Sequence, residues 1–399
     1  MKILIIGGGI AGLTAALALS RQNHDVVLFE KSEAFGEVGA GLQISPNASR
    51  ELIRLGLQDA LEQVAFNPRS LDMRRGHSGR QVFSIPLDEQ ALKKYGAPYW
   101  HLHRADLVNA LVKALKDMPN CEIRSGTHVS DYAQAKESVF LTLENGGIEQ
   151  GDIVVGADGI HSRLQKLILS HTNARFTGNV AWRTTIATTD EIRKLIPPSA
   201  TVWTGNKSHA VTYYIRGGEL MNFVGVIEQN EWSKETWTEE GDPNELREHF
   251  SGYCPAIKSA LQHVSQCFKW ALHDRQPLPK WTDGRAVLIG DAAHPMLPFL
   301  AQGAAMGIED AAFLTHCLLN HSTAPSAGLK HFERTRLPRT SRVQAGARSN
   351  MKLFHIDNSP VSFPFFSGMG IVNAFAPNVL AKRQDWLYCH DVLRTHEAS

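Results

Sequence analysis

The feature that most constrains this chain is a glycine pattern close to its N-terminus. Gly7, Gly9 and Gly12 follow a short apolar stretch, Lys2 to Ile6, and open a helical pattern that runs from Ile10 to Ser20. Glycines at this spacing allow a tight turn between strand and helix and let a diphosphate approach the helix N-terminus. The pattern therefore predicts a dinucleotide-binding βαβ unit.

An acidic residue at the end of the next strand supports this interpretation. Asp25 to Glu30 has the pattern of a second strand, and Glu30 stands 18 positions after Gly12. A carboxylate there can accept hydrogen bonds from the hydroxyls of an adenosine ribose. FAD and NAD share that half of the molecule, so this unit alone does not separate them.

The charge balance disfavours partners that depend on a strong electrostatic field. Lys and Arg total 41 against 40 for Asp and Glu, so we expect no nucleic acid partner and no acidic membrane partner. Five cysteines form no CxxC pair, which suggests neither a disulfide framework nor a zinc site. We expect a cytoplasmic protein with a small-molecule partner, and we leave open a homodimer.

Two apolar segments imitate membrane-directed sequences. The run up to Leu19 resembles a secretory signal, but its glycines suit a nucleotide turn and the chain continues directly into the second strand. Val361 to Ala381 has the length of a membrane span, yet Pro364 and Pro377 would break a lipid-facing helix. We interpret this second segment as a buried, broken cap on the core and expect no membrane span.

Further elements follow from apolar spacing and turn residues. We expect helices after Asn47, over Ala105 to Leu115 and from Gly303 to Leu319, and strands over Cys121 to Tyr132, Val139 to Leu143, Asp152 to Val155 and Arg285 to Ile289. Between Asn179 and Glu228, apolar residues alternate as in an antiparallel sheet.

Two later motifs identify a family. Residues 156–162 read GADGIHS and residues 284–294 read GRAVLIGDAAH. They resemble the "DG" and "GD" fingerprints of the aromatic-ring (group A) flavoprotein monooxygenases, and residues 103–107, HRADL, are similar to that family's FAD-contacting arginine segment. The family includes salicylate hydroxylase, 3-hydroxybenzoate 6-hydroxylase and 6-hydroxynicotinate 3-monooxygenase, and the likeness covers nearly the whole chain.

The resemblance implies an α/β fold with a Rossmann-like FAD-binding domain of the glutathione-reductase type and an inserted substrate domain built on a mixed or antiparallel sheet. We assign residues 1–70, 100–178 and 270–360 to the FAD-binding domain. Residues 71–99 and 179–269 form the expected substrate domain, and residues 361–399 form a C-terminal capping segment with helices.

The resemblance also implies cofactor contacts. Asp291 would hydrogen-bond the ribityl chain, Arg104 would contact the cofactor, and Val129 would meet the adenine half through its backbone. Asp158 either organises the loop near the pyrophosphate and the nicotinamide path or only braces that loop. The expected set for tightly bound FAD is Gly7, Gly9, Gly12, Glu30, Gln43, Arg104, Val129, Asp158, Asp291, Gly303 and Ala304.

A helix that starts at Gly303 would aim its positive end at the flavin ring, where reduction adds negative charge. Gly303 and Ala304 are small, so backbone amides can reach the ring. We expect His294, just upstream, to be a structural histidine and no metal to be bound.

The expected substrate residues lie on a predicted strand. His209 and Tyr213 are four positions apart and project from the same face, whereas Tyr214 points the other way. In the resembling hydroxylases a similar pair contacts the substrate phenol. Gln302 matches a pocket glutamine of that family, and we add Pro298, in the same segment, to the expected catalytic residues.

The resemblance implies a monooxygenase that takes a hydride from NADH or NADPH and uses O2 to hydroxylate a small aromatic acid through a flavin C4a-hydroperoxide. His209 would favour the phenolate and Tyr213 would orient it. The hydroxynicotinate enzyme has histidines where this chain has Gln43 and Phe299, which favours a carbocyclic acid over a pyridine. No second GxGxxG is present, so the pyridine nucleotide would bind only transiently.

Three alternatives stay open. A flavin hydroxylase of a quinone precursor or another bulky lipid would share the FAD motifs. A non-haem iron oxygenase could use His355, Asp357 and His390, which stand in the order of a facial triad. A non-catalytic FAD-binding module could act through a protein partner.

Overall fold

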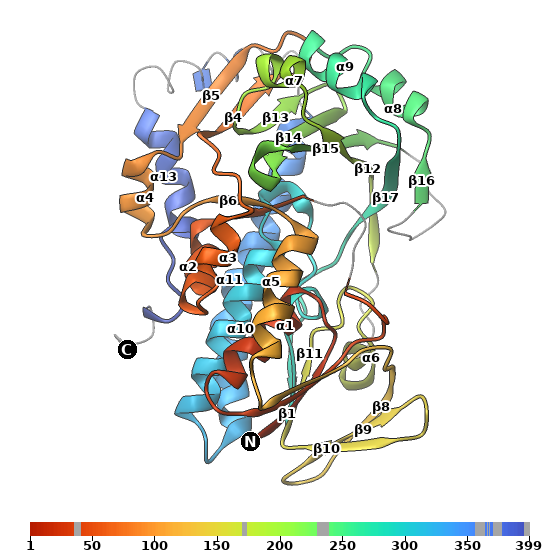
Figure 1. Ribbon diagram of the computed structural model, residues 1–399, viewed down its shortest axis with the longest axis vertical. Helices are drawn as coiled ribbons and strands as arrows, with labels where there is room; N and C mark the ends of the chain where they lie inside the picture. Colours follow the sequence, from red (N-terminus) through yellow and green to blue (C-terminus); the bar gives the residue numbers. More distant parts are fainter. Residues whose placement is uncertain are drawn as a thin grey trace.

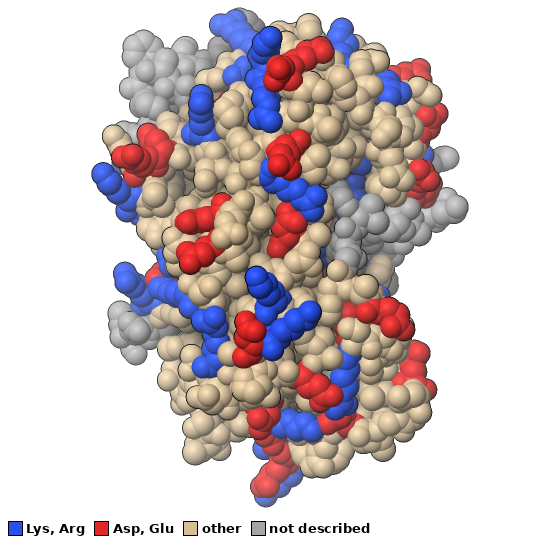
Figure 2. Space-filling view, viewed as in Figure 1, with Lys and Arg blue, Asp and Glu red and all other residues tan. Residues whose placement is uncertain are grey.

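The computed structural model describes residues 1–35, 41–169, 174–229, 239–355, 364, 366, 368, 369 and 377–394. Most of the expected cap over Val361 to Ala381 lies outside the described residues. Within the described ranges, no helix combines the length and the apolar character that crossing a membrane requires. On the face shown in Figure 2, basic and acidic side chains are interspersed over the surface.

A six-stranded sheet, in the lower half of Figure 1, carries the N-terminal βαβ unit. Its order is β18-β19-β11-β1-β2-β7, with the strands Thr282–Asp283, Ala286–Leu288, Ile153–Gly156, Lys2–Ile6, Asp25–Phe29 and Cys121–Arg124. All neighbours are parallel except β18 and β19. Apart from Lys2, the central strands β1 and β11 are apolar and buried, as expected for a parallel sheet covered on both faces.

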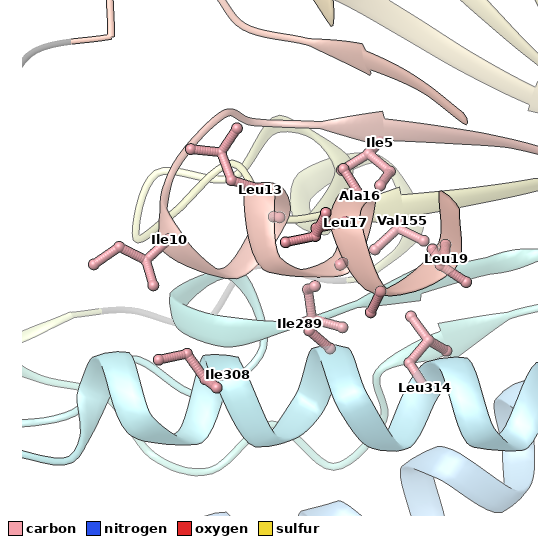
Figure 3. Packing of buried hydrophobic residues seen from close by; sticks show 14 of the residues in the cluster. Ile5, Ile10, Leu13, Ala16, Leu17, Leu19, Val155, Ile289, Ile308 and Leu314 are labelled. Atoms are coloured by element: carbon pink, nitrogen blue, oxygen red, sulfur yellow. The ribbon is translucent and has the colours of Figure 1, made fainter. Parts of the chain in front are cut away.

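Helix α1 (Ile10–Ser20) packs against α5 (Arg104–Lys116) and α10 (Gly303–Asn320). Figure 3 shows α10 running alongside α1, with Ile308 and Leu314 facing the side chains of α1. The helices approach closely because the contact uses small residues: a Cβ on Gly307 would lie 3.0 Å from the Cβ of Ala11. The GxGxxG helix and the helix of the expected flavin site are thus one packed unit.

The stretch Cys121 to Tyr132, predicted as one strand, is two strands in different sheets. β7 ends at Arg124, and β8 (Val129–Gln134) joins β9 (Val139–Leu143) and β10 (Ile148–Gly151) in a three-stranded sheet. Gly126 between them has φ +62°, which turns the chain. The prediction was wrong because the alternation of Cys121 and Ile123 resumes in the same register at Val129, beyond the turn.

An eight-stranded sheet forms the upper half of the molecule in Figure 1. Its order is β16-β17-β12-β15-β14-β13-β4-β5, with the strands Glu239–Gly241, Cys267–Asp274, Arg175–Ala187, Leu220–Glu228, Ser208–Ile215, Ala200–Thr204, Ser70–Arg75 and Gln81–Pro86. The predicted antiparallel pairing within 179–228 is confirmed for β12, β15, β14 and β13. The mixed sheet is completed by β4, which pairs with β13 in parallel.

The remaining elements surround and join these sheets. β3 (Gly41–Ile44) pairs with β6 (Trp100–His103). The other helices are α2 (Pro46–Arg54), α3 (Gln58–Glu62), α4 (Glu89–Tyr95), α6 (Arg163–Ile168), α7 (Asp190–Leu195), α8 (Pro243–His249), α9 (Pro255–Gln262), α11 (Pro325–Phe354) and α13 (Pro377–Tyr388), with short 3₁₀ turns η1 (Arg216–Gly218), η2 (Gly290–Ala292) and η3 (Pro298–Leu300). Helix α11 packs on α10 and also contacts β13, so it links the two sheets.

Candidate active site

The glycine loop has the shape that a diphosphate needs. Gly7 has φ +105°, and a Cβ on Gly12 would lie only 2.0 Å from the Gly7 carbonyl oxygen, so α1 begins directly against the loop. Gly9 differs, because a Cβ there would meet nothing within 4 Å. The loop is therefore closed on its inner side and open at Gly9, where a pyrophosphate can approach.

The start of α1 offers unblocked amides. Gly9 is its N-cap, no side chain caps the helix, and no acidic residue lies in the first turn, so the first amides remain available for an anion. Glu30 is held beside them by hydrogen bonds from the backbone amides of Gly8 (2.6 Å) and Ser32 (2.8 Å). These residues fit the pyrophosphate and ribose of FAD.

The DG motif braces the same loop. A Cβ on Gly7 would lie 2.4 Å from the Ala157 carbonyl oxygen, so the two motifs touch through their backbones. The Asp158 carboxylate accepts hydrogen bonds from Ser162 Oγ (2.5 Å) and from the Arg163 amide (2.6 Å) at the start of α6. These hydrogen bonds show that Asp158 holds the loop in place. Its proposed part in the nicotinamide path stays a prediction.

Asp291 lies in η2, between β19 and α10. Its side chain is exposed, yet burial among surrounding protein groups raises its pKa, opposed by the nearby His294 and Arg104. Solvent can reach this carboxylate although protein atoms surround it, which is typical of a residue that lines a cleft. Arg104 and Asp291, far apart in sequence, therefore belong to one site.

Helix α10 begins beside Asp291. A Cβ on Gly303 would lie 3.9 Å from Asp291 Oδ1, which leaves room between them. No side chain caps α10, and no acidic residue lies in its first turn, so its positive end is available to a group with developing negative charge. Ala301, with φ +52°, reverses the chain before the helix.

A pocket opens between these elements and the large sheet. Pro298 lines it together with Ile160 of the DG loop and Asp291 of the GD motif; its other lining residues are Trp270, Ala271, Leu272, His273, Pro295, Met296 and Leu297. The pocket therefore joins both fingerprint motifs to strand β17.

A larger basic pocket, of about 600 Å³, contains none of the predicted site residues and is lined by Arg50, Arg54, Lys93, Lys94, Tyr95, Gly96, Cys389, His390, Asp391 and Arg394. Its charges are partly matched internally, because Arg54 donates to Asp391 (2.6 Å) and Lys94 to Asp385 (2.6 Å). We do not place the chemistry there.

His209 and Tyr213 lie on the same face of β14, as predicted, with Val211 between them. Val211 pairs with Val202 of β13 and Val224 of β15. All three valines are only partly buried although they sit in the middle of the sheet. They form a partly exposed apolar row across three strands, which we call the valine floor.

The two ends of the valine floor differ. His209 is buried against the rings of Phe299 and Phe354, with centroids 5.4 and 5.1 Å away. Burial, reinforced by His355, lowers its pKa well below the usual value. His209 is therefore a neutral base at physiological pH.

Tyr213 lies beside β3, which carries Gln43, one of the expected FAD contacts. A Cβ on Gly41 would lie 2.6 Å from Tyr213 Cε2, and the Gly41 amide donates to Asn222 Oδ1 (2.9 Å). Burial raises the pKa of Tyr213, so its phenol stays protonated and can donate. Gln43, on the same strand as Gly41, accepts from Tyr99 Oη (2.8 Å).

Two further predicted residues, Gln302 and Val129, lie at the starts of α10 and β8. Gln302 is buried, and its amide donates to Ser45 Oγ (2.8 Å) and accepts from Asn47 Nδ2 (3.2 Å). Its side chain thus joins the N-cap of α10 to the start of α2, and contact with substrate stays a prediction. Val129 begins β8 in the three-stranded sheet, and its contact with adenine is likewise a prediction.

A buried ionic cluster beneath the GD motif was not anticipated. Arg336 donates to Glu309 (2.5 Å) and Asp310 (2.8 Å), and Asp310 also accepts from the Gly290 amide (2.9 Å). His294 Nε2 lies 2.5 Å from Asp310, as expected of a structural histidine. Sequence patterns did not reveal the cluster because charges on a helix usually mark its solvated face.

Asn222 was also missed. Its Nδ2 is buried without a hydrogen-bond partner, at the Tyr213 end of the valine floor. A buried unpaired donor is costly, which marks it as a candidate ligand contact.

The iron alternative receives no support from the described part of the chain. His355 uses Nε2 toward His209 and Nδ1 toward Glu228, and Asp357 lies outside the described residues. In the described residues, no group of three or more potential metal ligands is found.

Comparisons with known proteins identify the family. The FAD binding domain family matches residues 1–347. A 3-amino-4-hydroxybenzoate 2-monooxygenase of Streptomyces platensis is 36% identical over 90% of this chain and 90% of its own length. A 3-hydroxybenzoate 6-hydroxylase of Aquipseudomonas alcaligenes is 36% identical, over 87% of this chain and 88% of its own.

A solved structure supports the same conclusion. A salicylate hydroxylase substrate complex superposes with a TM-score of 0.82 and 26% identity, covering 98% of this chain and 96% of the other. The motifs, the fold and the relatives therefore agree, and the chain belongs to the family of FAD-dependent aromatic-ring monooxygenases, the group A flavoprotein hydroxylases.

Proposed function

We propose that this monooxygenase hydroxylates a small aromatic acid that carries a phenol, and that it consumes NADH or NADPH and O2. The observation that carries the proposal is the arrangement of His209 and Tyr213 at the two ends of the valine floor. Four strand residues span roughly 13 Å, which leaves space for one aromatic ring between the two side chains.

His209 would accept the phenol proton, and Tyr213 would orient the ring by donating a hydrogen bond. The neutral imidazole that burial enforces suits a base, and the protonated Tyr213 suits a donor. Asn222 Nδ2 offers a second donor beside Tyr213. These groups favour the ionised phenol, the form that is most reactive toward an electrophilic oxygen.

FAD would be held by the glycine loop, Glu30, Arg104 and Asp291, with its ring toward the start of α10. When bound, it supplies the hydride acceptor and the activation of O2. The uncapped start of α10 would stabilise negative charge on the reduced ring. Pro298 would line the approach to the ring, since it lines the pocket that contains Asp291.

Arg183 is our candidate for the substrate carboxylate. It pairs across the sheet with Val224 and so continues the row of the valine floor. Its guanidinium lies over the rings of Phe268 and Trp270 on β17, 5.9 and 5.3 Å from their centroids, so it would bind the carboxylate by turning toward β15.

The small-acid assignment is preferred over a bulky quinone precursor because the relatives named above act on benzoates. The absence of histidines at positions 43 and 299 favours a carbocyclic acid. We further propose a cytoplasmic location, which suits the five unpaired cysteines, and we propose a homodimer as the assembly to test.

The experiment is a screen of hydroxybenzoates, aminohydroxybenzoates and pyridine carboxylates for stimulated NADH or NADPH oxidation, with the product identified by mass spectrometry. We expect at least one benzoate to yield a hydroxylated product. Stimulation that produces only hydrogen peroxide, or the absence of any hydroxylated benzoate, would contradict the proposal. A protein that binds FAD without consuming NADH would favour the non-catalytic module.

A further inference from the structure

Three side chains form a continuous hydrogen-bonded chain from the valine floor to the surface. His209 Nδ1 lies 2.7 Å from His355 Nε2, and His355 Nδ1 lies 3.0 Å from Glu228 Oε1. Both distances are normal for hydrogen bonds. The three residues come from β14, the end of α11 and the end of β15, so only the fold brings them together.

Solvent exposure rises along this series of hydrogen-bonded side chains, from His209 to Glu228. His209 is 1% exposed, the His355 side chain 5%, and the Glu228 side chain 41%. The path therefore begins at a buried base and ends at a carboxylate in contact with water. His209 uses Nδ1 toward His355, which leaves Nε2 as the nitrogen that could meet a bound phenol.

The direction of donation along these hydrogen bonds is set by Glu228, the residue at the surface. An ionised Glu228 can only accept, so His355 Nδ1 must carry a hydrogen and its Nε2 must accept. His209 Nδ1 must then donate, which places the hydrogen of neutral His209 on Nδ1 and the lone pair on Nε2. This is the tautomer that a base for a bound phenol needs.

We propose that His355 and Glu228 complete a proton relay in which His209 passes the substrate's phenolic proton to solvent. The proposal rests on the proposed function, because the proton originates from a phenol at the valine floor. The O–H bond of the phenol breaks and His209 gains a hydrogen on Nε2 while losing the one on Nδ1. His355 makes the same exchange, Glu228 takes up the proton, and water removes it.

No electrons move in this sequence, and each imidazole ends neutral with its hydrogen on the other nitrogen. Passage of a proton in the reverse direction restores the starting tautomers. The relay explains why a base that is almost fully buried can exchange protons repeatedly: without His355, a proton on His209 would have no hydrogen-bonded route to water through the described residues.

A structural role is the competing interpretation, because His355 also ties the end of α11 to the large sheet. The two roles differ in what a glutamine would do. Glutamine can hydrogen-bond but cannot pass a proton through its amide at neutral pH. His355→Gln should therefore preserve the fold and FAD binding but slow proton transfer.

The kinetic test uses the FAD-loaded enzyme and a nitro-substituted hydroxybenzoate, whose phenolate absorbs visible light. Stopped-flow absorbance gives the rate of phenolate formation on binding. We expect His355→Gln to slow this step about tenfold or more, within the range by which positioned proton transfer accelerates reactions, and Glu228→Gln to slow it a few-fold. Substrate Kd and FAD content should stay close to parental values.

Matched controls are available for both variants. His321→Gln changes a partly buried histidine at the end of α10. Glu219→Gln changes an exposed carboxylate just before β15, the strand that carries Glu228. Both should form phenolate at the parental rate. Added imidazole should restore the rate in His355→Ala, which a purely structural defect would not permit.

A second measurement does not depend on turnover. In protein labelled with ¹⁵N at histidine, the ring signals of His209 should show hydrogen on Nδ1, and His355→Gln should change them. Hydrogen on Nε2 of His209 would overturn the relay, as would parental phenolate rates in both His355→Gln and Glu228→Gln. A third result would separate the two proposals. If His209 carries its hydrogen on Nδ1 but no aromatic acid is hydroxylated, the proposed function is wrong, whereas the direction of the hydrogen bonds from His209 through His355 to Glu228 is confirmed.

Discussion

The two walls of the active site are held by different forces. The cofactor wall is built from glycine turns and the uncapped starts of α1 and α10, which present backbone amides. It rests on the buried side-chain cluster of Glu309, Asp310 and Arg336 beneath the GD motif. The substrate wall consists of side chains that project from one face of a sheet. The first wall tolerates few substitutions, whereas the second can change its ligand one side chain at a time.

This difference predicts that substitutions on the cofactor wall act on stability and FAD affinity, and that substitutions on the substrate wall act on turnover. The predictions below test that separation.

The largest effect should come from Arg336→Met. Burial would raise the pKa of Glu309 and of Asp310, but Arg336 and its neighbours hold both at about 2. Removing the guanidinium leaves two buried carboxylates poorly compensated, which costs about 3–5 kcal/mol in the free energy of unfolding. Urea denaturation at pH 7 measures it, with the exposed Arg334→Met as control.

The pH dependence of this variant follows from the same pKa values. In the parent, the two lowered pKa values stabilise the folded state fully at any pH above about 4, the pKa of these carboxyls in the unfolded chain. This stabilisation is lost as the pH falls toward 2. The variant lacks that contribution, so the difference between the two proteins should shrink as pH falls below about 4. A difference that stayed constant would contradict the role of the ionic cluster.

The next effect concerns the glycine loop. Gly12→Ala places a Cβ 2.0 Å from the Gly7 oxygen, and Gly9→Ala places one in open space. We expect Gly12→Ala to lower the stability of the protein, because the added Cβ overpacks the loop. FAD affinity should fall about 100-fold, which corresponds to roughly 3 kcal/mol of binding free energy. Gly9→Ala should lower FAD affinity about tenfold with an unchanged Tm of the FAD-free protein.

Gly252→Ala is the control, because a Cβ there also meets nothing within 4 Å and the residue lies outside the loop. Fluorescence titration with FAD and thermal unfolding of the FAD-free protein measure both quantities. Equal behaviour of Gly9→Ala and Gly252→Ala would show that the diphosphate does not pass Gly9.

A smaller effect is expected at Tyr213. Tyr213→Phe removes a hydrogen-bond donor and keeps the ring, so kcat for the best benzoate should fall about tenfold, the effect of a hydrogen bond of roughly 1.5 kcal/mol. FAD content should not change. Tyr214→Phe, on the opposite face with its hydroxyl on the Ile196 carbonyl oxygen, is the matched control and should keep parental kcat.

The smallest effect is on the stability of the FAD-free protein. Because burial raises the pKa of Asp291, folding disfavours its charged form, and this cost is present above the raised pKa and vanishes below the unfolded pKa. Asp291→Asn should therefore raise the Tm of the FAD-free protein slightly at pH 7 and leave it unchanged at pH 3. A lower Tm at pH 7 would show that the carboxylate is stabilising without cofactor.

The same contrast explains what the sequence could predict. Backbone requirements demand particular residues, so Gly7, Gly9 and Gly12 are visible as a motif and their geometry is confirmed. The shared face of His209 and Tyr213 follows from strand periodicity alone. The turn at Gly126, which has a positive φ, was missed because the alternation of Cys121 and Ile123 resumes in the same register at Val129.

Other parts of the site depend on tertiary contacts. Val202, Val211 and Val224 become a floor only through the register of three strands, and Asn222 meets Gly41 across 181 positions. His355 reaches His209 only because α11 extends from the six-stranded sheet to the eight-stranded one. No local pattern contains these pairings, although a charged pair such as Glu309 and Asp310 on an otherwise apolar helix indicates a buried partner.

The most direct test of the two-wall account compares FAD affinity and product yield in Asp291→Asn and His209→Gln. We predict that Asp291→Asn weakens FAD binding at least about tenfold, by loss of a charge-assisted hydrogen bond, while each bound flavin still supports hydroxylation. His209→Gln should bind FAD with parental affinity and lose hydroxylation about 100-fold. Release of FAD by His209→Gln, or unchanged FAD affinity in Asp291→Asn, would contradict the account.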